Sequence, residues 1–246
     1  MMQTYVIGDV HGHLSRLIGA HALIEADRAR HGDRDTPVIH VGDLVDRGPD
    51  SRGVIDFMLR GQDEGRNWVT LLGNHDRMFA GFMADPDYHD PGLRAGLEWL
   101  DPPLGGAETL ASYGVRDAGE RLLFDIHAEA TAAVDPRHVA FIRGLPAYHL
   151  RGEALFVHAG VRPGVPLAAQ TEDDLVWIRR GFLEDRSDHG ALIVHGHTPE
   201  THVTHFGNRL DVDTGAGYGR ELSAVVVEGR DAWLLTAAGR VPVLRA

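Results

Sequence analysis

The chain has 246 residues, enough for one large α/β core, and a formal net charge of −12. An acidic composition lacks the basic patch that nucleic-acid binding needs, so we expect no nucleic-acid partner. Cysteine and lysine do not occur, which excludes disulfides, thiolate metal sites, cysteine nucleophiles, lysine-based catalysis and Walker-type phosphate loops. The sequence contains neither an apolar run of membrane-spanning length nor a signal peptide, so we expect a cytoplasmic protein without a membrane partner.

The N-terminal part of the chain alternates short apolar strands with amphipathic helices. Strands are predicted at residues 5–7, 38–41 and 68–72, and helices at residues 14–30, at residues 51–62 and through Met78 and Phe82. A strand, a short loop and a helix, repeated three times, indicate parallel strands joined by crossover helices. A turn at His31-Gly32-Asp33 is expected to close the first of these helices.

The pattern loosens between about residues 85 and 135, where proline and glycine separate short helical pieces. We interpret this segment as an insertion lying over the site, within a single domain that spans residues 1–246. Asp135 is predicted to cap a helix over residues 135–143, and a hairpin follows at residues 147–150 and 155–157. A short helix opens at Thr171, and further strands are predicted at residues 192–194, 201–206, 209–212, 222–227 and 233–235.

Polar side chains follow five of the predicted strands at their carboxyl ends. They are Asp9 and His11, Asp43, Asn74 and His75, His158, and His197. Ligands bind at the carboxyl ends of strands in open α/β sheets. Each motif alone is weak, because a Gly-Asp pair is usually a turn and an isolated buried histidine is usually structural. Five strand ends that carry carboxylate, amide and imidazole groups together predict a metal site.

The stretch from Gly42 to Gly48 concentrates two carboxylates and an arginine at the end of a buried strand. This charge needs compensation, so we expect Asp43 to bridge two cations and Arg47 to hold a phosphoryl group beside them. Carboxylate and imidazole without thiolate suit manganese first, with iron, zinc, nickel or cobalt as alternatives. Two such ions form the usual clamp for displacement at phosphorus, and they generate hydroxide from a shared water at neutral pH.

The order of these motifs resembles the signature of the calcineurin-like metallophosphoesterases. The matching elements are Gly8-Asp9-Val10-His11-Gly12, Gly42-Asp43-Leu44-Val45-Asp46-Arg47-Gly48, Gly73-Asn74-His75-Asp76, His158-Ala159-Gly160, Trp177-Ile178-Arg179, Gly196-His197-Thr198-Pro199 and Asp213-Thr214-Gly215-Ala216. The Asp-Arg-Gly element is similar to the phosphoprotein phosphatase branch, which includes bacterial and phage lambda-type serine/threonine phosphatases. The resemblance implies an α/β fold, a β-sandwich of two mixed sheets flanked by helices.

The resemblance also implies a role for each motif residue. By this resemblance one metal is bound by Asp9, His11 and Asp43, and the other by Asp43, Asn74, His158 and His197. The phosphoryl oxygens are held by Arg47 and Arg179. The general acid is His75, and Asp76 orients it. Three further residues have open roles at this point. Arg162 is expected to form a salt bridge, His195 to be either structural or a support for the ligands, and Tyr218 is a candidate for lining a substrate groove.

The expected activity is hydrolysis of phosphate monoesters by direct attack of the metal-bridging hydroxide, with His75 protonating the leaving alkoxide. A serine/threonine protein phosphatase, acting on phosphorylated proteins or peptides or on small phosphoesters, is the favoured reading. The alternative is a symmetrical diadenosine tetraphosphate hydrolase, because its metal signature is nearly the same. A non-catalytic scaffold on this fold is less favoured, since such proteins lose the general acid or the arginines that this chain keeps.

Overall fold

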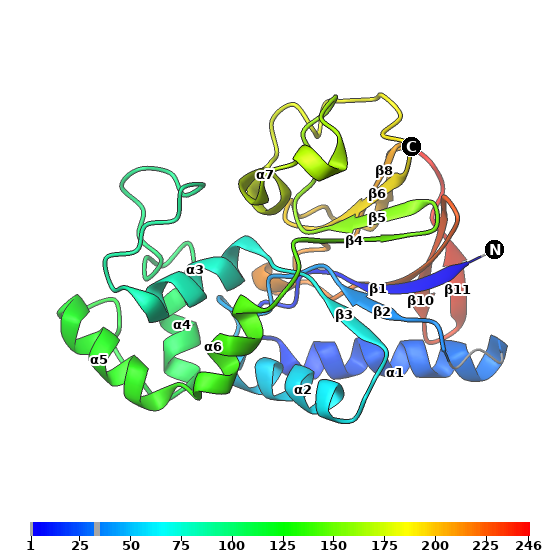
Figure 1. Cartoon of the computed structure of the whole chain (residues 1–246). Helices are drawn as coiled ribbons and strands as arrows, with labels where there is room; N and C mark the ends of the chain where they lie inside the picture. Colours follow the sequence, from blue (N-terminus) through cyan, green and yellow to red (C-terminus); the bar gives the residue numbers. More distant parts are fainter. Residues whose placement is uncertain (1, 32–34) are drawn as a thin grey trace.

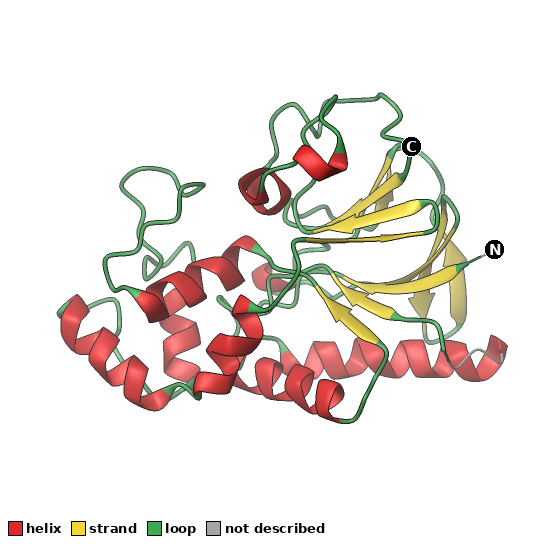
Figure 2. Ribbon diagram, in the orientation of Figure 1, coloured by secondary structure: helices red, strands yellow, loops and turns green. Residues whose placement is uncertain are grey.

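Two mixed β-sheets face each other, and helices cover the outer side of the larger one (Figure 1, Figure 2). The computed structural model describes residues 2–31 and 35–246, so the turn expected at residues 31–33 lies largely outside the described residues. The six-stranded sheet has the order β11 (Gly239–Pro242), β10 (Asp231–Thr236), β9 (Ala224–Glu228), β1 (Gln3–Ile7), β2 (Val38–His40), β3 (Trp68–Thr70). The five-stranded sheet has the order β4 (Tyr148–Arg151), β5 (Ala154–Val157), β6 (Leu192–His195), β8 (Arg209–Asp211), β7 (Thr204–His205). The expected α/β sandwich of two mixed sheets is confirmed.

The α-helices of the described residues lie in three places (Figure 1). The α-helices of the described chain are α1 (Leu14–His31), α2 (Ser51–Asp63), α3 (Asn74–Ala84), α4 (Gly106–Ser112), α5 (Leu123–Ala133), α6 (Pro136–Arg143) and α7 (Glu172–Trp177). Two short 3-10 helices, η1 (Leu167–Ala169) and η2 (Ala216–Tyr218), lie in loops. Helices α1 and α2 run beneath the larger sheet, and α3 to α6 form a cluster beside its end, while α7 lies near the smaller sheet.

Parallel strands bring the carboxyl ends of both sheets to one edge. In the larger sheet β1 pairs with β2 and β2 with β3, both in parallel, as the crossover pattern predicted. In the smaller sheet β5, β6 and β8 are also parallel. The β4–β5 hairpin, expected from the sequence, delivers β5 in the direction that this arrangement requires. The loops after β1, β2, β3, β5 and β6 therefore converge where the two sheets meet.

The central strand β1 is buried on both faces over Tyr5-Val6-Ile7, which explains this apolar run. Tyr5 and Ile7 belong to the core between the sheet and the helices, whereas Val6 belongs to the core between the two sheets. This alternation follows from the two-residue period of a strand. A third apolar cluster, containing Leu175 of α7 and Phe182, covers the outer side of the smaller sheet.

The segment interpreted as an insertion carries its own buried side chains. Trp99, Leu104 and Leu110 belong to the same apolar core as α2 and α3. The segment is also attached by Asp90, which is 1% exposed and accepts hydrogen bonds from Arg77 of α3 and from Trp177 Nε1 of α7 (2.8 Å). These contacts hold the loop between α3 and α4 against the elements that surround the strand ends.

Some elements differ from the expected ones. Strand β11 was not predicted, because Gly239 and Pro242 bound a short segment whose residues are half-buried or exposed. The strand expected at residues 201–206 contracts to β7, which pairs only through Thr204 and His205. Over the described residues, none of the helices combines the length and the apolarity that crossing a membrane demands.

A buried ion pair joins α1, β1 and β11. Asp27 of α1 is 1% exposed and accepts hydrogen bonds from Tyr5 Oη (2.8 Å) and from Arg240 Nη2 (2.7 Å). Burial raises the pKa of the Tyr5 phenol, so it remains a donor. The Arg240–Asp27 contact therefore attaches β11, the last strand of the larger sheet, to helix α1.

We expect Asp27→Ala to lower the free energy of unfolding by about 2–4 kcal/mol, since it leaves a buried phenol and a half-buried guanidinium without their acceptor. Urea denaturation measures this change. The matched control is Asp231→Ala, which breaks the exposed Asp231–Arg245 pair (2.9 Å) and should cost less than about 0.5 kcal/mol. Equal losses in the two variants would contradict the importance assigned to the buried pair.

Candidate active site

The loops that follow the strands have an unusual backbone conformation. Of the non-glycine residues that the structure describes, six have positive φ, and five of these belong to the motifs at the strand ends: His11 (45°), Asp43 (50°), Asp46 (72°), Arg47 (66°) and His197 (67°). A non-glycine residue seldom adopts this conformation, and its cost is tolerated mainly at functional sites. The strain therefore coincides with the residues that the sequence marked as a site.

Two glycines allow the loops to approach each other closely. A Cβ atom on Gly73 would lie 2.2 Å from the backbone N of Asp43, and one on Gly48 would lie 2.0 Å from the carbonyl oxygen of His11. Both distances are far below van der Waals contact, so any side chain at these positions would push the loops apart. Because Gly48 and Gly73 lack side chains, the loop after β2 can lie close to the loops after β1 and β3.

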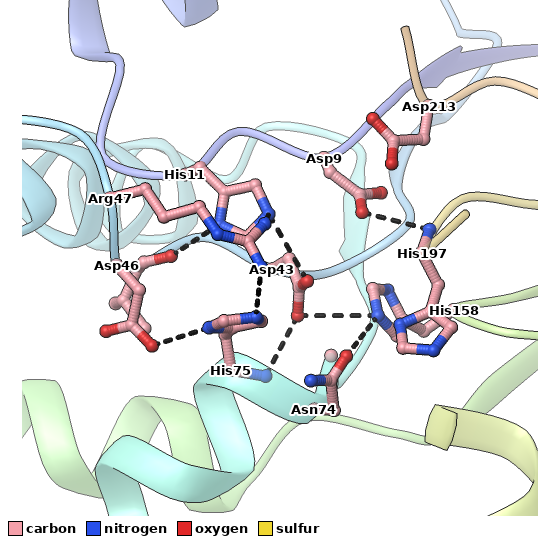
Figure 3. Close-up of polar contacts among 12 residues, drawn as sticks. Asp9, His11, Asp43, Asp46, Arg47, Asn74, His75, His158, His197 and Asp213 are labelled. Carbon is pink, nitrogen blue, oxygen red and sulfur yellow. Dashed lines mark hydrogen bonds and ion pairs between the residues drawn. The ribbon is translucent and has the colours of Figure 1, made fainter. Parts of the chain in front are cut away.

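The carboxylate of Asp43 lies between two imidazole rings from different sheets (Figure 3). Its Oδ2 is 3.5 Å from His11 Nε2, and its Oδ1 is 3.4 Å from His158 Nε2. Oδ1 also accepts the backbone N–H of His75 at 3.0 Å, at the start of α3. Each oxygen of this one buried carboxylate therefore faces the imidazole nitrogen of a different histidine.

Backbone carbonyls fix the tautomers of both rings. His11 Nδ1 donates to the carbonyl oxygen of Val45 and His158 Nδ1 donates to that of Val41, each at 2.9 Å. Burial lowers the pKa of both rings below the ordinary histidine value, so they are neutral at pH 7. With Nδ1 carrying the proton, Nε2 of each ring presents a lone pair beside Asp43. This is the arrangement that metal-binding histidines adopt.

Several acceptor atoms face one another without a donor between them. His158 Nε2 is 3.0 Å from Asn74 Oδ1, and with the ring proton on Nδ1 both atoms are acceptors. Among the described residues, the buried atoms Asp9 Oδ1 and His197 Nε2 have no hydrogen-bond partner. Burial, together with the charges of Asp213 and Asp43, raises the pKa of the Asp9 carboxyl. A divalent cation would satisfy these lone pairs and balance the carboxylates, so the residues fit metal ions.

Ligand atoms converge in two groups that share Asp43. One group contains His11, Asp43 and His75, the other contains Asp43, His158 and His197, and the atoms in each lie within 4.8 Å of one another. Asp9, expected as a ligand, is absent from both groups, and its Oδ2 accepts the backbone N–H of His197 at 2.9 Å. That hydrogen bond joins the first strand of one sheet to the other sheet across the site (Figure 3).

The two arginines lie at different parts of the site. Arg47 donates from Nη1 to His11 Nε2 (2.7 Å) and from Nη2 to His75 Nε2 (2.9 Å), so its guanidinium supplies positive charge between these rings. Arg179 donates from Nη2 to the carbonyl oxygen of His197 (3.1 Å). The guanidinium of Arg47 also stacks over the ring of Tyr218, 4.9 Å from the centroid. Two cationic donors thus flank the cluster of ligand atoms.

The carboxylate that orients His75 is Asp46, and the expectation that Asp76 does so was wrong. His75 Nδ1 donates to Asp46 Oδ2 at 2.6 Å (Figure 3). The Asp76 carboxylate accepts instead from the backbone N–H groups of Leu44 (2.8 Å) and Gly73 (3.0 Å). Asp76 lies in the first turn of α3, where a carboxylate reaches back to the preceding backbone, as in a capping box.

The structure also places the three residues whose roles were open. Arg162 forms the expected salt bridge, with Asp174 Oδ1 at 2.6 Å. His195 is buried, its Nε2 lies 3.2 Å from Arg209 Nη1, and it takes no part in the two groups of ligand atoms. Tyr218 remains 60% exposed beside Arg47.

Residues 2–226 match the Calcineurin-like phosphoesterase family, so the chain belongs to this family of metal-dependent phosphoester hydrolases. It is 26% identical over 234 residues to "Serine/threonine-protein phosphatase 1" of Salmonella typhimurium, with 91% of each chain covered. It is 24% identical over 246 residues to the asymmetrical "Bis(5'-nucleosyl)-tetraphosphatase PrpE" of Anoxybacillus flavithermus, with 89% of this chain and 88% of that one covered.

A solved structure supports the fold alone. The cold-active protein-tyrosine phosphatase of a psychrophilic Shewanella species has a TM-score of 0.64 and is 16% identical, with 99% of this chain and 81% of that chain covered. The two relatives from Salmonella typhimurium and Anoxybacillus flavithermus carry names that refer to different substrates.

Metal analysis of the purified protein tests the shared position of Asp43. After loading with Mn²⁺ and desalting, the wild-type chain should retain about two ions, and His11→Ala about one. Asp43→Ala should retain less than one, because its carboxylate faces both groups of ligand atoms.

The matched controls are His202→Ala and Asp87→Ala, which remove an exposed imidazole and an exposed carboxylate away from the site and should not change the metal content. An Asp43→Ala protein that still retains one full ion would rule out a shared ligand. Circular dichroism of each variant verifies that it is folded.

Proposed function

We propose that this protein hydrolyses phosphate monoesters and is a phosphatase of the serine/threonine protein phosphatase type. One observation carries the proposal: two groups of candidate cation ligands share Asp43, Arg47 lies beside them, and His75, a member of one group, is held by a buried carboxylate. A binding protein would not need the combination of ligand atoms, anion-binding arginines and an oriented imidazole.

We assign the ligands to two divalent ions, manganese being the first candidate. Asp9, His11 and Asp43 would hold one ion, and Asp43, Asn74, His158 and His197 would hold the other. When bound, such ions supply Lewis acidity and lower the pKa of water. The unpartnered atoms Asp9 Oδ1 and His197 Nε2 support this assignment, since each gains a partner when a cation binds.

The two arginines would bind the phosphoryl group. Arg47 donates to the lone pairs of His11 and His75, and both donors can turn to phosphoryl oxygens when a cation takes over His11 and His75 Nε2 carries the proton that it gives to the leaving oxygen. Arg179 is an exposed residue, yet desolvation of its guanidinium lowers the pKa below the ordinary arginine value, and an arginine stays charged at pH 7. A dianionic phosphoryl group between two guanidinium groups would form charge-assisted hydrogen bonds with both.

His75 would act as the general acid at its Nε2 atom. Its Nδ1–H donates to Asp46, so Nε2 is the ring nitrogen that faces Arg47 and the site. A serine or threonine alkoxide is a poor leaving group and needs a proton as the P–O bond breaks. Asp46 would hold the ring in the required orientation and stabilise its protonated form, as a buried carboxylate does for a catalytic histidine elsewhere.

A dinucleoside polyphosphate hydrolase is the second candidate. The tetraphosphatase relative is similar over nearly as much of the chain as the protein phosphatase relative. The exposed ring of Tyr218 beside Arg47 also favours this reading, because an aromatic side chain at a phosphate site can stack with a nucleobase. Comparison of turnover on a phosphoserine peptide and on symmetrical diadenosine tetraphosphate decides between the two, and higher kcat/KM on the dinucleotide would overturn our choice.

Substitution of the general acid should affect substrates according to their leaving group. We expect His75→Asn to lower kcat on a phosphoserine peptide by about 100-fold or more, and on an activated aryl phosphate by less than about tenfold. Asp46→Asn should show the same selectivity, because it removes the carboxylate that holds the ring.

Asp76→Asn is the informative comparison, since that carboxylate binds backbone N–H groups and leaves the ring free of contact. Its losses, if any, should be equal on both substrates. Equal losses on both substrates in His75→Asn would refute the role assigned to His75.

A further inference from the structure

The carboxylate that holds His75 is itself held by two side chains of the segment between α3 and α5. Trp99 Nε1 donates to Asp46 Oδ2 at 2.9 Å, and Thr109 Oγ1 donates to Asp46 Oδ1 at 2.7 Å. Asp46, with a relative exposure of 0%, thus accepts from His75 and from both of these donors. No motif of the sequence pointed to Trp99 or Thr109.

Thr109 also contacts the backbone of Asp46, and Trp99 also contacts helix α3, which carries His75. The hydroxyl of Thr109 accepts the backbone N–H of Asp46 at 2.8 Å, where φ is +72°. The ring of Trp99 packs against Phe79 and Phe82, with centroids 5.9 and 4.8 Å away. Phe79 and Phe82 lie one and two turns beyond His75 on α3, so Trp99 contacts both the carboxylate and the helix of the imidazole.

Space around these contacts is filled tightly. A Cβ atom on Gly106 would lie 2.5 Å from the Trp99 ring, and one on Gly105 would lie 2.3 Å from the backbone N of Arg47. Arg47 N also donates to the carbonyl oxygen of Gly105 at 3.2 Å. The segment from Trp99 to Thr109 therefore packs directly against the loop that contains Asp46 and Arg47.

We propose that Trp99 and Thr109 are positioning residues for proton donation: they fix the Asp46 carboxylate so that His75 presents Nε2 to the leaving oxygen. The proposal rests on the function proposed above and adds a role for the segment between α3 and α5. An Asp46 carboxylate that has lost Trp99 or Thr109 as a donor could rotate about its side-chain bonds, and the ring that it holds would rotate with it. Buried networks of this kind constrain geometry when every member is paired.

The test uses two substitutions that each remove one donor to the Asp46 carboxylate, and Thr109→Val also removes an acceptor of the Asp46 backbone N–H. Trp99→Phe keeps an aromatic ring and Thr109→Val keeps the shape of the side chain. Each should lower kcat on a phosphoserine peptide by about tenfold, leave KM unchanged and change turnover of an activated aryl phosphate by less than about twofold. Combined with His75→Asn, neither should cause a further loss, because the group that it positions is already absent.

Matched controls separate this role from packing. Tyr113→Phe removes a buried donor of the same region, the hydroxyl 2.8 Å from His138 Nδ1, and should leave both activities unchanged. Thr109→Ser keeps the hydroxyl and should retain the turnover of the phosphoserine peptide. Equal losses on the two substrates, or a further loss on top of His75→Asn, would overturn the positioning role.

A second readout is independent of activity. His75 Nδ1 lies 2.6 Å from Asp46 Oδ2, and the proton in this short hydrogen bond should give a downfield NMR resonance that is absent in His75→Asn. We expect this resonance in the wild type, Tyr113→Phe and Thr109→Ser, and its broadening or loss in Trp99→Phe and Thr109→Val. A resonance that is unchanged in both Trp99→Phe and Thr109→Val would refute the positioning role, even if the enzyme acts on another phosphoester. Absence of monoesterase activity alone would refute only the proposed function.

Discussion

One buried carboxylate, that of Asp43, constrains the whole arrangement, because each of its oxygens faces an imidazole nitrogen from a different sheet. A carboxylate at 2% exposure is stable in its ionised form only when positive charge or donors surround it. Its position requires the positive φ of its own residue, the missing side chain of Gly73 and the convergence of β1, β2 and β5. The parallel strands of both sheets therefore bring imidazole nitrogens to the two sides of this carboxylate.

Lone pairs and positive charge lie close together around this carboxylate. Lone pairs of histidine, asparagine and aspartate point inward, and Arg47 supplies positive charge between His11 and His75. The helical segment beyond α3 completes the arrangement, since Trp99 and Thr109 both donate to Asp46. A segment that sequence reading treats as a covering insertion is thus packed against the residues expected to carry the chemistry.

Most of the residues that the structure brings together here could be singled out from the sequence, because they lie in short motifs directly after apolar strands. The partner of His75 could not be found in this way. Asp76 is adjacent in sequence, but the first turn of α3 directs its carboxylate to the N–H groups of Leu44 and Gly73. Asp46 reaches the ring from another loop through a left-handed backbone conformation, and Trp99 lies 53 residues from Asp46. Contacts that depend on tertiary packing between distant segments leave no local pattern.

The central claim is that Asp43 lies between two cations. Anomalous diffraction from crystals soaked in Mn²⁺ tests it most directly, since it locates each ion relative to the two carboxylate oxygens. The account predicts two peaks, one beside Oδ2 and His11 and one beside Oδ1 and His158, about 3.5–4 Å apart. A single peak distant from Asp43, or none in a crystal whose side chains keep the arrangement described above, would contradict it.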